Sequence, residues 1–158
     1  ALHLATQSPE GARRIGSHQR RVNAVAWSLD GARLASCGAD GVVSLWSASG
    51  AAEGTLTSHG SSVVALAWSP DGKLLASSDL RGVIQVWNAQ ERRLVKRLQA
   101  GSRPVYALTW MARPLTLLSG GDDGVLRAWE PGAWKAQSFR YPVPVRGLAS
   151  HPSVARVA

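Results

Sequence analysis

The sequence predicts an all-β fold, arranged as a radial array of small four-stranded antiparallel sheets. Short apolar runs alternate with turn sequences such as Asp30-Gly31 and Asp71-Gly72, and glycine supplies the positive φ that tight turns need. The stretch 18–46 returns as 59–87 and, less faithfully, as 100–129. Tryptophans at equivalent positions (27, 68 and 110) are 41 and 42 residues apart. This period, with four strands in each unit, indicates a ring of sheets rather than one continuous sheet.

The units follow one another along the chain with short connections. Residues 1–17 carry two short apolar runs, at 1–5 and 12–15, and are expected to form the two outer strands of a preceding unit. Three complete units are expected at 18–58, 59–99 and 100–140. Residues 141–158, whose apolar run covers 143–150, are expected to supply the two inner strands of a further unit. All these segments are predicted to belong to one partial domain.

Composition narrows the class of protein. The 158 residues are 45% hydrophobic and 18% charged, which is typical of a globular chain with a real core. The sequence has a single cysteine, Cys37, no signal peptide, and no apolar run near the roughly 18 residues that a membrane span needs. We therefore expect an intracellular protein, cytoplasmic or nuclear, without membrane insertion.

The net charge of +8 raises the possibility of a nucleic-acid partner. The basic residues are spread along the chain, however, and the densest cluster, at 92–97, falls on a predicted outer strand and its turn. That placement favours an ordinary solvated surface. RNA or DNA binding through a basic face remains an alternative.

Five features recur in register: a loop His, Trp-Ser-x-Asp-Gly, Leu-Ala-Ser, a turn Asp-Gly and a final Trp. With these features the units resemble the WD-repeat β-propeller family over nearly the whole chain. The resemblance implies a β-propeller of four-stranded antiparallel WD-repeat blades, with three complete blades and two partial ones. Family propellers usually have seven blades, so the ring must close with further blades. Two sources stay open: a longer chain of which this is a segment, or a second copy that completes an eight-bladed ring.

Ser, His and Asp side chains in the first blade are the residue types of a hydrolase triad. The sequence lacks the glycine-flanked nucleophile elbow that such an enzyme needs. The positions instead match the structural tetrad of WD-repeat blades, in which Asp accepts from His, His meets Ser, and Ser meets the Trp N–H. The resemblance assigns this tetrad to His18, Ser36, Asp40 and Trp46.

The other two blades are predicted to hold partial tetrads. The second keeps His59, Ser77 and Trp87, but Arg81 stands at the Asp position and Asp79 lies two residues out of register. The third has Ala100 in place of His and keeps three members: Ser119, Asp123 and Trp129. Only the first blade is expected to complete its network, and His18→Ala is therefore expected to destabilise the fold more than His59→Ala.

The two tryptophan series are expected to form the core between blades. One series ends the first strand of each unit and the other ends the third: Trp27, Trp68, Trp110, and Trp46, Trp87, Trp129. Trp134 lies outside both series and is expected either to be an exposed contact residue or to pack beneath its loop.

The sequence shows no metal or cofactor site. His3 and His151 have no partner at metal-ligand spacing, and no phosphate-binding loop is present. We expect no metal, no cofactor and no catalytic residue.

Family propellers bind partners mostly on the face that carries the loops between blades. Carried over position by position, the resemblance places a partner-binding face at Arg21, Asn23, Ser62, Val64, Leu80, Tyr106, Asp122 and Arg146, and Arg20 and Arg103 lie beside these positions in the sequence. Arg21, Tyr106 and Arg146 are the strongest candidates, because Arg and Tyr are favoured at interface hot spots. Such a face suits an acidic or phosphorylated segment of a protein.

The function expected from these observations is a non-catalytic scaffold or adaptor that mediates protein–protein interaction. It is expected to act within a longer chain or a multisubunit complex. One alternative is a sensor or autoinhibitory propeller attached to a signalling ATPase or another multidomain enzyme. The second alternative is the nucleic-acid-binding propeller.

Overall fold

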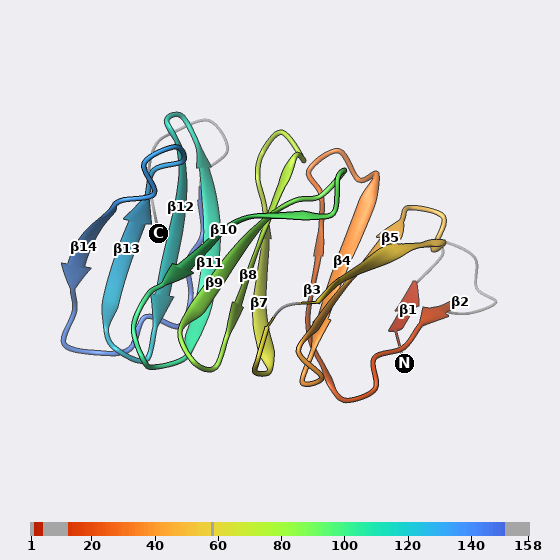
Figure 1. Ribbon diagram of the computed structural model, residues 1–158, viewed down its shortest axis with the longest axis horizontal. Helices are drawn as coiled ribbons and strands as arrows, with labels where there is room; N and C mark the ends of the chain where they lie inside the picture. Colours follow the sequence, from red (N-terminus) through yellow and green to blue (C-terminus); the bar gives the residue numbers. More distant parts are fainter. Residues whose placement is uncertain (1, 5–12, 58, 151–158) are drawn as a thin grey trace.

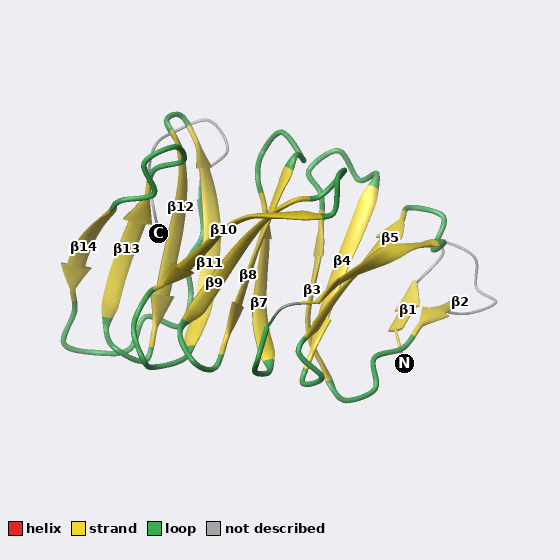
Figure 2. Cartoon of the chain, viewed as in Figure 1, coloured by secondary structure: helices red, strands yellow, loops and turns green. Residues whose placement is uncertain are grey.

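A computed structural model describes residues 2–4, 13–57 and 59–150. In these ranges every regular element is a β-strand (Figure 2). The predicted all-β class is confirmed. The strands form antiparallel sheets that stand side by side along the molecule (Figure 1).

Three four-stranded sheets carry the three complete blades, each a meander in which strands neighbouring in sequence are also neighbours in the sheet. The first blade comprises β3 (Val22–Trp27), β4 (Arg33–Gly38), β5 (Val42–Ser47) and β6 (Ala52–Thr57). The second comprises β7 (Val63–Trp68), β8 (Leu74–Asp79), β9 (Val83–Asn88) and β10 (Arg93–Gln99). The third comprises β11 (Val105–Ala112), β12 (Leu115–Gly121), β13 (Val125–Trp129) and β14 (Ala136–Arg140).

The Asp-Gly turns close the inner hairpins as the sequence predicts. In the first blade, Asp30 Oδ1 accepts hydrogen bonds from Ser28 Oγ at 2.6 Å and from the Ala32 amide at 3.0 Å. Gly31 has a φ of 68°, a value that costs a residue with a β-carbon. Ser69 and Asp71 repeat this arrangement in the second blade. In the third blade, which has lost the Asp-Gly, only two residues separate β11 from β12.

A partial blade precedes the first complete one. Strands β1 (Leu2–Leu4) and β2 (Arg13–Gly16) form an antiparallel pair. Ile15 packs against Leu34 and Trp46 of the first blade. A β-carbon at Gly16 would clash with the Trp46 ring, so the backbone of β2 packs closely against that indole. The two predicted outer strands are therefore present at this end.

The other end differs from the prediction. No strand forms between residues 141 and 150, where only Ser150 makes an isolated bridge, and the second predicted strand lies outside the described residues. The segment is predicted to pair with that second strand of its own blade rather than with the third blade. The segment still follows the third blade, because the Val145 amide donates to Gly121 O at 2.9 Å and the Thr109 hydroxyl donates to Ser150 Oγ at 3.0 Å.

The hydrophobic core lies between adjacent blades. One cluster joins β4, β5 and β6 to the second blade and includes Leu45, Leu75 and Trp87. A second cluster joins the second and third blades and includes Ile84 and Trp129. Trp134 is half-buried and packs against this second cluster, so it is not a free contact residue. Because each blade buries its faces against its neighbours, the stability of one blade depends on the next.

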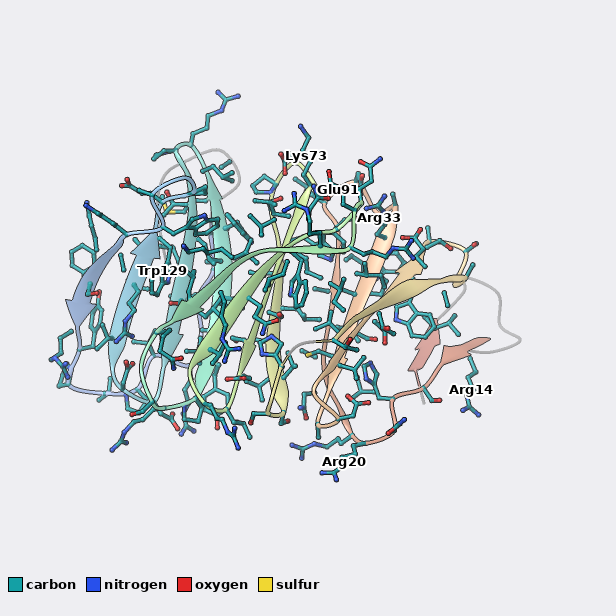
Figure 3. All side chains as sticks on the ribbon, viewed as in Figure 1. Arg14, Arg20, Arg33, Lys73, Glu91 and Trp129 are labelled. Atoms are coloured by element: carbon teal, nitrogen blue, oxygen red, sulfur yellow. The ribbon has the colours of Figure 1, made fainter. Side chains whose placement is uncertain are left out.

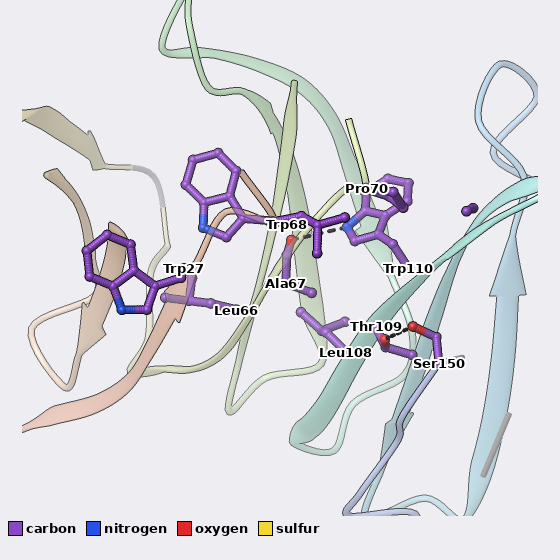
Figure 4. Close-up of a pocket in the computed structure, with 11 residues that line it drawn as sticks. Trp27, Leu66, Ala67, Trp68, Pro70, Leu108, Thr109, Trp110 and Ser150 are labelled. Atoms are coloured by element: carbon purple, nitrogen blue, oxygen red, sulfur yellow. Dashed lines mark hydrogen bonds between the residues drawn. The ribbon is translucent and has the colours of Figure 1, made fainter. Parts of the chain in front are cut away.

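The tryptophans that end the innermost strands link blade to blade. Trp68 Nε1 donates to Ala26 O at 3.0 Å. Trp110 Nε1 donates in the same way to Ala67 O at 3.1 Å (Figure 4). Trp27 departs from the prediction that the whole series is buried, since it is 45% exposed. In the described residues the partial blade before β3 has no inner strand, so the Trp27 ring lacks the neighbour that Ala26 of β3 provides for Trp68.

We expect Trp68→Phe to lower the free energy of unfolding by about 1 kcal/mol more than Trp27→Phe. The first change removes a hydrogen bond to Ala26 O from a buried indole, and such a bond contributes about 0.5–1.5 kcal/mol net. Trp27 makes no such bond in the described part of the chain. Urea denaturation of the two variants measures the difference, and equal losses would contradict the role given to the Trp68 bond.

Candidate functional site

The loops between blades and the turns after β4, β8 and β12 lie at the same end of the strands. We call this end the loop face; it comprises residues 17–21, 38–41, 59–62, 79–82, 100–104, 121–124 and 141–144. Arg20 lies at this end, whereas Arg33, Lys73 and Glu91 lie at the opposite end (Figure 3).

The loop face is held together by backbone hydrogen bonds. Within a blade, the turn donates to the entering loop: the Ala39 amide bonds Arg21 O at 2.8 Å, and the Leu80 amide bonds Ser62 O at 3.2 Å. The connection to the third blade is held in the same way, because the Ala100 amide extends the β9–β10 ladder by bonding Gly82 O at 2.9 Å, and Gly82 in turn lies against Arg103 O of the next entering loop. The face is therefore a connected layer rather than a set of independent loops.

The first blade contains the predicted tetrad as a continuous series of hydrogen bonds that runs from the aspartate to the tryptophan. His18 Nδ1 lies 3.1 Å from both oxygens of Asp40, and His18 Nε2 lies 2.9 Å from Ser36 Oγ. Trp46 Nε1 donates to the same hydroxyl at 2.9 Å. Burial acts to raise the pKa of Asp40, but hydrogen bonds from the Val42 amide and from His18 outweigh it and leave this pKa below its ordinary value.

The second blade is also complete, which corrects the prediction of a partial tetrad. His59 Nδ1 lies 3.1 Å from Asp79 Oδ2, His59 Nε2 lies 2.7 Å from Ser77 Oγ, and Trp87 Nε1 donates to Ser77 Oγ at 2.9 Å. Burial, opposed by the hydrogen bond to Asp79, lowers the pKa of His59. The expected ranking of His18→Ala above His59→Ala therefore loses its basis.

The first turn explains how Asp79 reaches the histidine from two residues away. Gly38 occupies the position equivalent to Asp79, and a β-carbon there would lie 2.8 Å from Asp40 Oδ1 and 2.9 Å from His18 Nδ1. Side chains from either turn position can thus fill the same space. Asp79 Oδ1 also accepts hydrogen bonds from the Arg81 and Val83 amides, as Asp40 Oδ1 does from the Val42 amide.

In the third blade, which lacks the histidine, an arginine pairs with the turn aspartate. Trp129 Nε1 still donates to Ser119 Oγ at 2.9 Å. Asp123 accepts from the Val125 amide and pairs with Arg127 Nη1 at 2.7 Å. Sequence reasoning missed Arg127. Its signal was a cation at the position of Ser44 and Gln85, in the blade that lacks the loop His.

These hydrogen-bond networks stabilise the fold, and their serine hydroxyls are not placed to act as catalytic groups. Ser36 and Ser77 have no exposed surface, and each hydroxyl is already engaged by a histidine and an indole. A substrate cannot reach them. Within the described ranges, no group of His, Cys, Asp or Glu is placed to hold a metal ion, and no helix long and apolar enough to cross a membrane is found.

The predicted partner-binding residues separate into two groups. Asn23 and Ser62 join the first two blades: Asn23 Nδ2 donates to Ser62 Oγ at 2.9 Å and to Val63 O at 2.7 Å. Val64 is half-buried. The remaining residues include the exposed members of the set, namely Arg20, Arg21, Leu80, Arg103, Tyr106 and Arg146.

Two of the three strongest candidates contact each other. The Arg146 guanidinium lies 5.5 Å from the Tyr106 ring centre and pairs with Asp122 at 3.0 Å. Arg21 Nε donates to Asn23 Oδ1 at 3.1 Å and has no carboxylate partner among the described residues. Arg146 is therefore already neutralised, whereas Arg21 keeps an unbalanced charge.

On the loop face the acidic side chains have partners, whereas several of the basic ones do not. Its described acidic residues are all engaged: Asp40 and Asp79 with histidines, Asp123 with Arg127 and Asp122 with Arg146. Four exposed arginines, Arg20, Arg21, Arg81 and Arg103, form no ion pair with a described carboxylate. Sequence reasoning missed Arg81 as a surface residue, because Arg81 stands at the turn position that the motif gives to aspartate.

The three meanders with their shared interblade cores define the class of protein as a partial β-propeller. Two family models match: "WD domain, G-beta repeat" over residues 12–47 and "Anaphase-promoting complex subunit 4 WD40 domain" over residues 51–113. The chain belongs to the WD-repeat β-propeller family. No curated protein matches it in sequence.

Solved structures with the same fold include "Structure of U3-55K" (TM-score 0.80, 23% identity, covering 85% of this chain and 44% of that one). "Crystal structure of RRP9 WD40 repeats" has a TM-score of 0.80 and 23% identity, over 85% of this chain and 43% of that one. "Crystal Structure of Mitotic Checkpoint Complex" has a TM-score of 0.80 and 24% identity, over 88% and 44%. The present chain spans less than half the length of each of these three matched proteins.

WD-repeat propellers generally mediate protein–protein interaction and are generally non-catalytic.

Proposed function

We propose that this chain is a non-catalytic docking platform inside the cell that binds a protein partner through its loop face. It acts within a longer polypeptide or a multisubunit complex. The partner contributes an acidic or phosphorylated segment. The observation that supports this proposal is the charge imbalance of the loop face, where the described carboxylates are engaged and exposed arginines are not.

The exposed arginines have the chemistry for such a role. Guanidinium groups bind carboxylates and phosphates through paired, charge-assisted hydrogen bonds. Leu80, which is 38% exposed on the same face, adds an apolar contact. Because the connected backbone of the loop face holds these residues in place, binding costs little ordering of the loops.

Site-specific photo-crosslinking tests the proposal without depending on charge. A photoreactive phenylalanine derivative replaces Leu80 on the loop face or, as the matched control, the exposed Ala112 near the opposite end of β11. Expressed in cells as part of its native polypeptide, the Leu80 variant is expected to crosslink to a distinct protein and the Ala112 variant is not. Equal crosslinking from both positions, or none from Leu80, would contradict docking on this face.

Nucleic-acid binding is the second candidate, supported by the net charge of +8 and the exposed strand β10 with Lys96 and Arg97. Two neighbouring arginines are engaged: Arg93 pairs with Glu91, and Arg92 Nη1 donates to Glu53 O. RNA or DNA crosslinked to the Leu80 variant would favour this candidate. Affinity carried by phosphates alone would fall steeply with added salt.

A further inference from the structure

The unpaired arginines of the loop face form two groups. Arg20 and Arg21 are consecutive in the loop that enters the first blade. Arg81 lies in the turn of the second blade and Arg103 in the loop that enters the third. The seam between those blades brings these two loops together, because a β-carbon at Gly82 would lie 2.8 Å from Arg103 O. Gln99 Nε2 also ties the two loops, donating to Arg81 O and to Gly101 O.

The surface between the two groups carries no carboxylate. It is formed by the loop that enters the second blade, where Gly60, Ser61 and Ser62 are small and uncharged. This loop contacts the first blade, since a β-carbon at Gly41 would lie 3.0 Å from His59 O. It also contacts the second group, because a β-carbon at Gly60 would lie 3.9 Å from Arg81 Nη1. Leu80 stands exposed beside Arg81.

From this arrangement we infer that the loop face binds an extended peptide segment of a partner protein that carries two clusters of Asp or Glu separated by an uncharged, partly apolar stretch. One cluster pairs with Arg20 and Arg21, and the other pairs with Arg81 and Arg103. The middle of the segment crosses the Gly60–Ser62 loop and contacts Leu80. This inference rests on the proposed docking function and specifies its partner.

Two clusters are needed for a physical reason. A single exposed ion pair contributes little, because water screens both charges and two long side chains must be ordered. Linking two weak contacts through one peptide makes the second contact intramolecular, so the affinity of the whole exceeds that of either half. The small side chains at 60–62 leave room for a backbone to pass between the two groups.

The inference can be tested with synthetic peptides and the full chain. The probes have Glu-Glu at both ends of Gly/Ser spacers of graded length with one central Leu, Glu-Glu at one end only, or a single central phosphoserine. Fluorescence anisotropy is expected to show that the best two-ended peptide binds at least about tenfold more tightly than the one-ended peptide. Arg20→Glu/Arg21→Glu and Arg81→Glu/Arg103→Glu are each expected to reduce its binding to the one-ended level.

Lys73→Glu is the matched control, since Lys73 is exposed at the opposite end of the molecule, and it is expected to change affinity less than twofold. Circular dichroism melts identify any variant that is unfolded, and Arg→Gln then replaces Arg→Glu. Equal binding of one-ended and two-ended peptides, tighter binding of the phosphoserine peptide, or equal weakening by Lys73→Glu would overturn the inference. If the Leu80 crosslink to a partner protein persists in that case, the docking function stands and only the two-cluster partner is wrong.

Discussion

Asp79→Ala is expected to lower the free energy of unfolding by about 3 kcal/mol. Asp79 is 1% exposed, and its carboxylate accepts hydrogen bonds from His59 and from the Arg81 and Val83 amides. Removing it leaves these donors buried without their acceptor, at about 1–3 kcal/mol for each group that water cannot reach. Denaturation in urea, followed by tryptophan fluorescence, measures the loss.

A paired substitution separates this effect from ordinary loss of packing. Asp79→Gly with Arg81→Asp converts the second turn into the pattern of the first, in which Gly38 precedes Asp40. Because both turn positions reach the same space beside the histidine, the double variant is expected to recover most of the stability that Asp79→Gly alone loses. No recovery would show that the two positions are not equivalent.

Gly82→Ala is expected to lower the free energy of unfolding by about 3 kcal/mol or more. Gly82 has a φ of 76°, and the left-handed region costs a residue with a β-carbon about 1–2 kcal/mol. The added atom would also clash with Gly101 O and lie 2.8 Å from Arg103 O. These backbone atoms cannot move away independently, because Ala100 is bonded to Gly82 O. The steric cost therefore adds to the conformational one.

Gly31→Ala provides the matched control. Gly31 has a similar φ of 68°, but a β-carbon there would meet nothing within 4 Å. Its loss is expected to stay at about 1–2 kcal/mol, the conformational cost alone. Parallel denaturation of the two variants isolates the seam between the second and third blades. A Gly82→Ala variant no less stable than Gly31→Ala would contradict the close contact at that seam.

Much of the fold could be predicted from repetition. The Asp-Gly turns, the apolar runs and the 41- to 42-residue period locate three four-stranded blades. Side-chain networks were harder to predict, because a side chain that is out of register with the repeat can still reach the same place in the folded blade. Asp79 lies two residues out of register in the sequence, yet its carboxylate reaches His59. In the blade where Ala100 stands in place of the histidine, Arg127 pairs with Asp123 from a strand position that no motif marks.

The residues of the predicted binding face that remain free to bind a partner could not be predicted from the sequence either. Family positions selected Arg21, Tyr106 and Arg146, but Arg146 is engaged by Asp122 and Tyr106. In the sequence Arg81 stands where the tetrad has its aspartate, and in the structure it is an exposed cation beside the loop of Arg103. A list of charged residues cannot tell which charges are already paired, since pairing depends on contacts between blades that are distant in the sequence.

By itself, the sequence determined the architecture of this protein: short strands, tight turns and a repeating unit that cannot bury its faces alone. These properties are local or periodic, and the chain records them residue by residue. Only the tertiary structure decided which histidine networks are complete, why Trp27 is exposed while Trp68 is buried, and which arginines remain free. Each of these depends on which side chains meet across a turn or between neighbouring blades, and that is settled when the blades pack together.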